Sequence, residues 1–232
     1  MFSFRSVAAA CLMAGLVAST LAADSKAEAI KKALQEVGDL PGEWTGNGDT
    51  KLAGKKSLWK ETISWGWKFS KDGSNTLKMD VKDGQFLKSG ELTYLPEKKL
   101  YQFTATDGAK KELVFTGKIE KGQLVLDRKE TGGDVQRLKF YTLSDGARMM
   151  IVSETQSKGK GLFSKQYQIS ASNAAESFAG GAKKPECIVT GGSASIAVSF
   201  EGKTYYVCCS GCRDEFNASP KKYVDEFLKK KK

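Results

Sequence analysis

The chain has no histidine among its 232 residues. A Ser-His-Asp hydrolase site therefore cannot be built from it, and no imidazole can serve as a metal ligand. Any transition-metal site must rest on sulfur, with carboxylate, carbonyl, methionine or water as supplements. The sequence also lacks a glycine-rich phosphate loop and a convincing catalytic carboxylate pair, because Asp and Glu fall mostly in turn segments. We therefore expect a protein that is not an enzyme.

Long apolar runs are also absent: beyond residue 23, none approaches the ~18 residues needed for a membrane-spanning helix. The first 23 residues have the three parts of a secretory signal peptide. A short positive segment ends at Arg5, an apolar core covers 7–17, and small residues precede the cleavage site. We expect residues 1–23 to be removed and the mature protein to be exported, to the periplasm or the extracellular space, without a transmembrane segment.

Positive charge is in excess, with 37 Lys and Arg against 27 Asp and Glu and a formal net charge of +10. The lysines are scattered through turns and solvent-facing positions, and the one dense run, Lys229 to Lys232, lies at the C-terminus. No nucleic-acid-binding motif accompanies the charge, so we expect no nucleic-acid partner.

Residues 24–170 predict a helix followed by a β-rich body. Asp24 or Ser25 can cap a helix that runs to about Val37, with its apolar residues near one face. From Gly42 the apolar period changes to two, which is typical of strands with one buried face. Asp-Gly and other Gly-containing turns separate about ten such strands. A meander of this length usually closes into a barrel, because closure removes its exposed edges.

The start of this body, Gly42-Glu43-Trp44 after a helix, resembles the G-x-W start of lipocalin-like (calycin) barrels. The resemblance implies an up-and-down barrel whose mouth holds a small apolar ligand. Trp59, Trp65 and Trp67 would either line such a cavity or simply fill the barrel, and we favour filling. Haem-binding barrels of this kind usually use a proximal histidine, which this chain lacks.

Residues 171–184 are rich in Ala, Ser, Gly and Lys and predict a flexible linker. Residues 185–232 follow as a small domain that holds four of the five cysteines, the fifth being Cys11 in the signal peptide. Two strands at 195–200 and 203–208, a helix from about Cys212 and a last helix from Pro220 are expected there. A domain of about 48 residues is usually marginal and needs a metal or a disulfide as a staple.

The four cysteines of this domain are Cys187, Cys208, Cys209 and Cys212. Twenty residues separate Cys187 from Cys208, and three residues separate Cys208 from Cys212, while Cys209 and Cys212 form C-x2-C. If Cys208 ends a strand, the side chain of Cys209 points to the opposite face unless the strand breaks between them. The C-x2-C spacing taken alone favours Cys209 as the one that joins Cys212 in a metal site.

The same stretch resembles the YHS and TRASH family of small treble-clef-like metal-binding domains. The likeness rests on Cys187-Ile-Val-Thr-Gly191, Gly202-Lys-Thr-Tyr-Tyr-Val-Cys208 and Gly211-Cys-Arg213, followed by Phe216, Pro220 and Tyr223. It implies Cys187, Cys208 and Cys212 as ligands of one heavy-metal ion per chain. Cys209 is an extra thiol outside the family pattern and is a candidate for a fourth ligand. Three thiolates suit Cu(I) and four suit Zn(II).

Sequence analysis thus favours an exported protein that binds Cu(I) or Zn(II) through thiolates, for metal trafficking or sequestration. One alternative is a lipocalin-like carrier of a small apolar ligand, in which the cysteine domain is an accessory module stapled by disulfides or zinc. Export favours disulfides in general. Thiol redox chemistry at Cys209 and Cys212 is a third alternative, although no thioredoxin-like βαβ pattern surrounds them.

Overall fold

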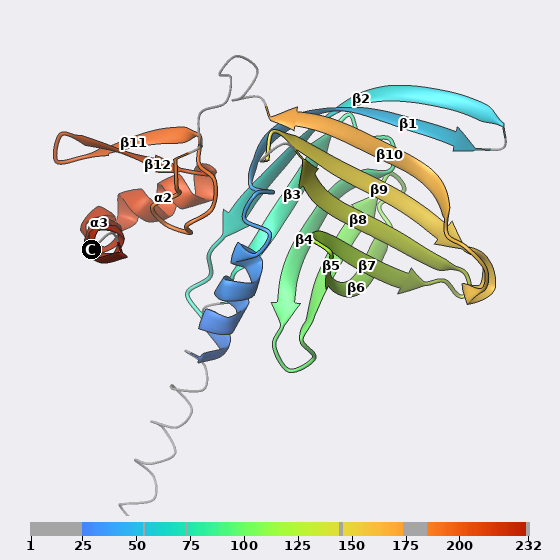
Figure 1. Cartoon of the computed structure of the whole chain (residues 1–232), viewed down its shortest axis with the longest axis horizontal. Helices are drawn as coiled ribbons and strands as arrows, with labels where there is room; N and C mark the ends of the chain where they lie inside the picture. The colour runs from blue at the N-terminus through green and yellow to red at the C-terminus, as the bar shows by residue number, and fades with distance from the viewer. Residues whose placement is uncertain (1–24, 53, 73, 144–145, 174–184, 231–232) are drawn as a thin grey trace, which may run out of the picture.

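The computed structural model describes residues 25–52, 54–72, 74–143, 146–173 and 185–230. The predicted signal peptide lies outside these ranges. Within them the fold is mainly β, as predicted: an N-terminal helix, a closed antiparallel barrel and a small α+β unit (Figure 1). No helix in these ranges is long and apolar enough to cross a membrane.

Ten strands follow one another around the barrel, and β1 pairs with both β2 and β10 to close it. All the pairings are antiparallel, so the up-and-down meander expected from the two-residue period is confirmed. The strands are β1 (Gly42–Leu52), β2 (Lys55–Lys68), β3 (Thr76–Lys82), β4 (Leu87–Leu95), β5 (Leu100–Asp107), β6 (Glu112–Glu120), β7 (Gln123–Lys129), β8 (Val135–Leu143), β9 (Arg148–Gln156) and β10 (Ser164–Asn173). A short 3-10 turn, η1 (Ser157–Gly159), joins β9 to β10.

β10 continues to Asn173, so the predicted start of the linker at residue 171 lies inside a strand. Residues 170–173 pair with β1, because that strand begins at Gly42 and offers backbone partners as far as Trp44. The remainder of the predicted linker, residues 174–184, lies outside the described residues.

Aromatic side chains fill the centre of the barrel. The ring of Trp65 is fully buried, with its centroid 5.9 Å from that of Phe103 and 5.7 Å from that of Phe140. Trp67 is also buried and stacks on Phe69. Two of the three tryptophans considered as cavity lining therefore occupy the core.

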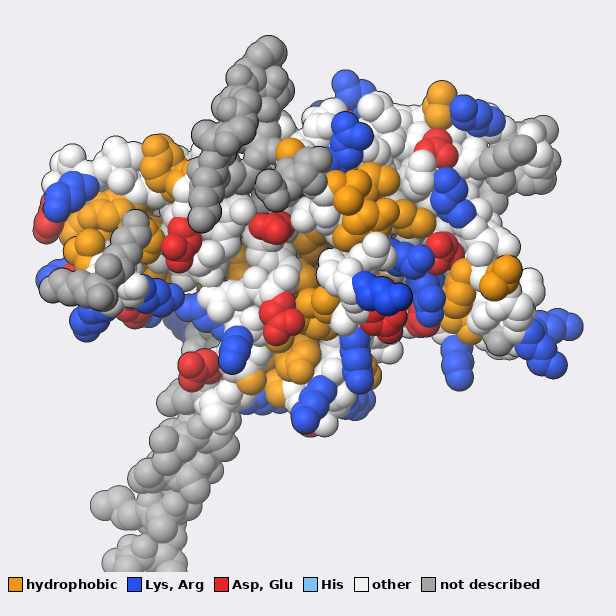
Figure 2. All heavy atoms as spheres, viewed as in Figure 1, with side chains coloured by type: hydrophobic (Ala, Val, Ile, Leu, Met, Phe, Trp, Pro, Cys, Tyr) orange, Lys and Arg blue, Asp and Glu red, His pale blue; other side chains and the backbone are white. Residues whose placement is uncertain are grey.

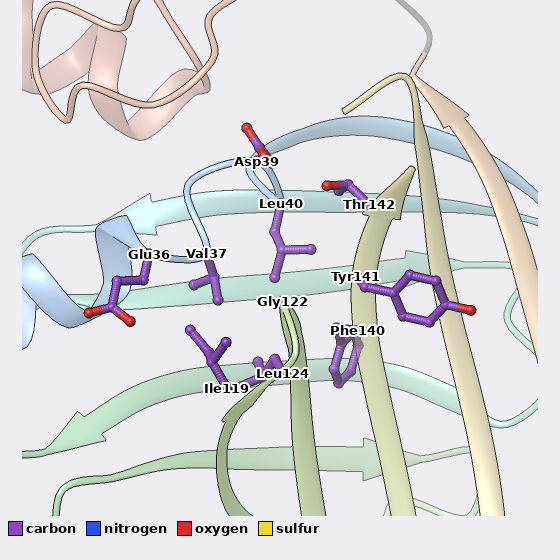
Figure 3. A pocket seen from close by; sticks show the side chains of 10 residues that line it. All are labelled: Glu36, Val37, Asp39, Leu40, Ile119, Gly122, Leu124, Phe140, Tyr141 and Thr142. Atoms are coloured by element: carbon purple, nitrogen blue, oxygen red, sulfur yellow. The ribbon is translucent and has the colours of Figure 1, made fainter. Parts of the chain in front are cut away.

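The N-terminal helix, residues 25–35, covers the end of the barrel where β1 begins and β2 ends (Figure 1). The backbone carbonyl of Ala33 accepts a hydrogen bond of 2.8 Å from the hydroxyl of Tyr101 in β5. After the helix a turn carries Val37 and Leu40 down onto the barrel end, where they lie near Leu124 and Phe140 (Figure 3). Only about 100 Å³ of cavity remains among these side chains, so this end is essentially closed.

The opposite end of the barrel holds a larger cavity and a buried carboxyl group. The cavity is about 270 Å³ and lies beside Phe86, Phe115 and Tyr167. Glu61 is only 4% exposed, and its carboxylate accepts a hydrogen bond of 2.6 Å from the indole N–H of Trp59. Burial raises the pKa of Glu61. Sequence analysis missed this residue because it assigned the acidic side chains mostly to turns, although Glu61 shares the inward-facing register of Ile63.

Candidate metal centre

The small C-terminal unit begins with a loop that is folded back on itself around Cys187. The backbone N–H of Cys187 donates to the carbonyl of Gly192 at 2.7 Å, and the N–H of Gly191 donates to the carbonyl of Cys187 at 2.7 Å. Gly191 has a φ of 77°, a conformation that favours glycine. The N–H of Ile188 donates to the carbonyl of Tyr206, which ties the loop to the hairpin that follows.

That hairpin consists of β11 (Ile196–Phe200) and β12 (Lys203–Val207), and two helices follow it, α2 (Ser210–Ala218) and α3 (Pro220–Lys230). The turn residues Glu201 and Gly202 both have positive φ, as the predicted tight turn requires. Phe216 of α2 is fully buried against Phe200 and Tyr205 of the hairpin. Pro220 begins α3, as predicted.

All four cysteines of this unit are buried and free. The sulfur atoms of Cys187, Cys208 and Cys212 all lie within 4.8 Å of one another, and those of Cys208 and Cys212 are 3.4 Å apart. Within the described chain, these three form the cysteine group that could hold a metal ion. They come from the folded-back loop, the end of the hairpin and the first turn of α2.

Strand β12 ends at Val207, one residue earlier than expected, and this decides where the sulfur of Cys209 lies. Because neither Cys208 nor Cys209 belongs to the strand, their side chains need not point to opposite faces. The sulfur of Cys209 lies 3.9 Å from that of Cys208. Cys209 therefore borders the three-sulfur group, and its sulfur accepts a hydrogen bond from Cys208 and a second one from outside the group.

This hydrogen bond joins the cysteine unit to the barrel: the backbone N–H of Trp67 in β2 donates to the sulfur of Cys209 at 3.3 Å. β1 begins opposite Trp65, so β2 extends beyond its partner strand here. Gly211 also packs closely against the backbone of Trp67: a Cβ atom added to Gly211 would lie only 2.0 Å from the carbonyl oxygen of Trp67. We call this junction between residues 208–212 and the end of β2 the seam.

The segment after the N-terminal helix supports the other side of the site. The side-chain amide of Gln35 donates to the carbonyl of Thr190 at 2.6 Å, and the hydroxyl of Ser193 donates to Asp39 at 2.9 Å. Thr190 is buried, and its hydroxyl lies 3.8 Å from the sulfur of Cys208. The loop that carries Cys187 is therefore held between the hairpin on one side and, on the other, the end of the N-terminal helix and the turn that follows it.

Hydrogen bonds among the thiols divide the four cysteines into two classes. Bonds from Cys208 and then from Cys212 lower the pKa of both Cys187 and Cys209 well below that of a free thiol. The same sharing raises the pKa of Cys208 and Cys212, with the bond to Cys187 as the largest cause in each case. The hydrogen bonds thus favour the thiolate form of Cys187 and Cys209 over that of Cys208 and Cys212. A soft cation that bound here would displace the thiol protons, because metal ligation requires thiolates.

The seam residues were not found by sequence analysis. Trp67 was assigned only to the barrel, and Gly211 was noted only as part of a turn and of a family motif. The strand lengths that create the seam, 11 residues in β1 and 14 in β2, are known only from the structure. On the face shown in Figure 2, Lys and Arg are interspersed with Asp and Glu.

Comparisons with known proteins give little further information. No known family model matches the chain, and no curated protein matches it. Among solved structures, the crystal structure of Rv2717c from M. tuberculosis is 12% identical and aligns with 61% of this chain and 96% of its own, at a TM-score of 0.38. A likeness of this degree carries no argument about the site.

The seam leads to a prediction about Gly211. Replacing Gly211 with Ala should lower the free energy of unfolding by about 1–3 kcal/mol, the usual cost of overpacking. The added Cβ would collide with the carbonyl oxygen of Trp67. A decrease in the free energy of unfolding would itself point to the seam, because Gly→Ala within a helix otherwise raises that free energy by roughly 1 kcal/mol. Urea unfolding of the mature chain measures the difference.

Gly66→Ala is the matched control on the barrel side of the seam, since a Cβ there meets no atom within 4 Å. It should leave stability nearly unchanged. A Gly211→Ala variant as stable as the wild type would show that the two parts are not in close contact.

Proposed function

We propose that the protein is an exported, non-enzymatic metal-binding protein that holds one soft metal ion per chain, Cu(I) or Zn(II), for trafficking or sequestration. Cys187, Cys208 and Cys212 would be the ligands. The observation that carries the proposal is the convergence of their three buried sulfurs within 4.8 Å of one another. Soft thiolates select Cu(I) and Zn(II) over harder cations.

The sulfur spacing supports this proposal. A Zn–S bond of about 2.3 Å implies about 3.8 Å between the sulfurs of a tetrahedral site. The 3.4 Å between Cys208 and Cys212 is slightly shorter, and all the separations lie below 4.8 Å. An ion could therefore be accommodated by side-chain adjustments of less than about 1 Å, without rebuilding the backbone.

Cys209 would decide between the two metals. Cu(I) is satisfied by three thiolates, whereas a closed structural Zn(II) site takes four ligands. Its sulfur is 3.9 Å from that of Cys208, close enough to turn toward a shared ion. A thiolate has several lone pairs, so Cys209 could bind the ion and still accept the hydrogen bond from Trp67.

Two other uses of the thiols have less support. Structural disulfides would join the sulfurs in pairs, whereas three of the four free cysteines, Cys187, Cys208 and Cys212, converge as one group. Thiol redox chemistry at Cys209 and Cys212 would use the start of α2, where a helix dipole favours the thiolate. Yet Cys212 is fully buried and Cys209 is only 5% exposed, so neither sulfur can reach a disulfide on the surface of a protein substrate.

A second candidate function is transport of a small ligand by the barrel. The observation that favours it is the cavity of about 270 Å³ at the end opposite the helix. Its wall combines Phe86, Leu113 and Phe115 with the polar side chains of Gln136 and Gln166. Such a site would suit a small molecule with an apolar body and a hydrogen-bonding group.

The metal proposal is tested by replacing Cys212 with Ser, which removes one ligand at nearly constant volume. The affinities for Zn(II) and Cu(I) are measured by competition with chromophoric chelators. Loss of a residue that only hydrogen-bonds to a metal ligand lowers affinity about 10–100-fold, so loss of a ligand itself should lower it further. Ser210→Ala, the exposed neighbour, is the control and should bind as the wild type does. Cys209→Ser should weaken the binding of Zn(II) and leave the binding of Cu(I) unchanged. Unchanged stoichiometry and affinity in Cys212→Ser would refute the ligand assignment.

The carrier proposal is tested by tryptophan fluorescence. Trp59 packs edge-on against Phe86 and Tyr167, which border the cavity, so a ligand bound there should change its emission. A panel of lipids and porphyrins is titrated against the mature protein and against Trp59→Phe, which should lose the change. No shift with any compound would count against transport by the barrel.

A further inference from the structure

The sulfur cluster borders a cavity on one side. A space of about 340 Å³ lies between the barrel and the cysteine unit, and Cys208 and Cys209 are among the residues that line it, whereas Cys187 and Cys212 are not. The barrel wall comes from the start of β1 and the end of β2, including Glu43, Ser64 and Gly66. The facing wall includes Ser195, Ile196 and Ser210.

The lining residues of this cavity differ in burial from its opening to its floor. Glu43, Ser195 and Ser210 are exposed and form its rim, whereas Cys208 and Cys209 are 2% and 5% exposed and form its floor. The carboxylate of Glu43 is held at the rim by a hydrogen bond from the hydroxyl of Ser64. The cavity therefore leads from a polar opening to two sulfur atoms of the cluster.

We propose that this cavity is the port through which the metal ion is exchanged, and that the ion arrives bound to a small thiol rather than to a protein partner. The proposal rests on the metal-binding function above. A volume of about 340 Å³ falls at the lower end of the range for small-molecule sites. At about 30 Å³ per water molecule it admits a molecule of amino-acid size but no folded domain.

Exchange at the port is a ligand substitution without electron transfer. A sulfur–metal bond forms to Cys208 as the bond between the metal and one carrier thiolate breaks. The proton of the Cys208 thiol passes to that departing thiolate, which leaves as a neutral thiol. Each further bond, to Cys187 or Cys212 deeper in the site, displaces another carrier thiolate or a metal-bound water, and a proton still on the incoming sulfur passes to the departing thiolate or to solvent. The barrel contributes directly, because it supplies one wall of the port.

Gly66 offers a way to close the port without touching a cysteine. A Cβ atom there meets no atom within 4 Å, so the ring in Gly66→Phe should occupy the cavity rather than collide with the backbone. Gly132→Phe is the matched control: Gly132 is equally open but lies in the turn between β7 and β8 and does not line the cavity. Ser210→Phe narrows the port from the opposite wall as a second variant.

The first measurement uses reduced, metal-free mature protein and iodoacetamide, with labelled sites assigned by tandem mass spectrometry. Access is compared within each pair of like pKa: Cys209 should be labelled faster than Cys187, whose pKa is also lowered, and Cys208 faster than Cys212, whose pKa is also raised. Gly66→Phe and Ser210→Phe should slow this labelling by about tenfold or more, the factor that roughly 1.4 kcal/mol of added barrier gives. Gly132→Phe should behave as the wild type. Urea unfolding confirms that each variant is folded.

The second measurement follows zinc transfer from a cysteine–zinc complex to the metal-free protein. The port predicts that Gly66→Phe slows loading while the final amount of bound zinc is unchanged. If the protein binds zinc and neither loading nor labelling is slowed, the port is wrong and the metal-binding function stands. If the wild type binds neither zinc nor Cu(I), the metal-binding function fails and the exchange role fails with it.

Discussion

The structure depends on the seam, in which residues 208–212 cover the end of strand β2 that extends beyond β1. Since β1 begins opposite Trp65, the backbone of Trp67 would otherwise face solvent on that side. Its N–H donates to the sulfur of Cys209, and its carbonyl oxygen lies against Gly211. Buried backbone groups must find partners, and here a sulfur atom of the candidate metal centre is one of them. The barrel and the cysteine cluster therefore share a contact.

Because of this contact, the stability of the C-terminal unit need not come from a bound metal ion alone. An isolated domain of about 48 residues rarely buries enough apolar surface to be stable without a staple. Here one continuous core runs from the barrel into the cysteine unit and includes Val207, Phe216 and Val224. With this support, an ion could leave without unfolding the unit. Metal exchange, rather than a permanent structural zinc, is the behaviour that such an arrangement allows.

The barrel, hairpin and C-terminal helices could be predicted because local patterns specify them. Alternation along β2, the Glu201-Gly202 turn and Pro220 each encode a nearby structure. The grouping of Cys187, Cys208 and Cys212 was implied by a family resemblance. The seam could not be predicted, because it joins Trp67 to Cys209 across 142 residues. Glu61 was missed for a different reason: a buried carboxylate contradicts the general preference of acidic residues for solvent.

The position of Cys209 shows how a shift of one residue alters the chemistry. A strand through Cys208 would have turned the sulfur of Cys209 away from the cluster. The strand ends at Val207, and Cys209 instead takes the position before the first residue of α2, with an extended backbone. Strand ends cannot be placed to one residue from sequence, so the neighbourhood of this sulfur had to come from the structure.

The most direct test of the account is a joint measurement of metal content and free thiols on the protein recovered without added reductant from the compartment to which the predicted signal peptide would direct it. The account predicts about one Cu or Zn per chain, together with four reduced cysteines that resist alkylation until the metal is removed. A chain that carries no metal and no free thiols would contradict it. The cysteine unit would then be stapled by disulfides, and function would have to be sought in the barrel.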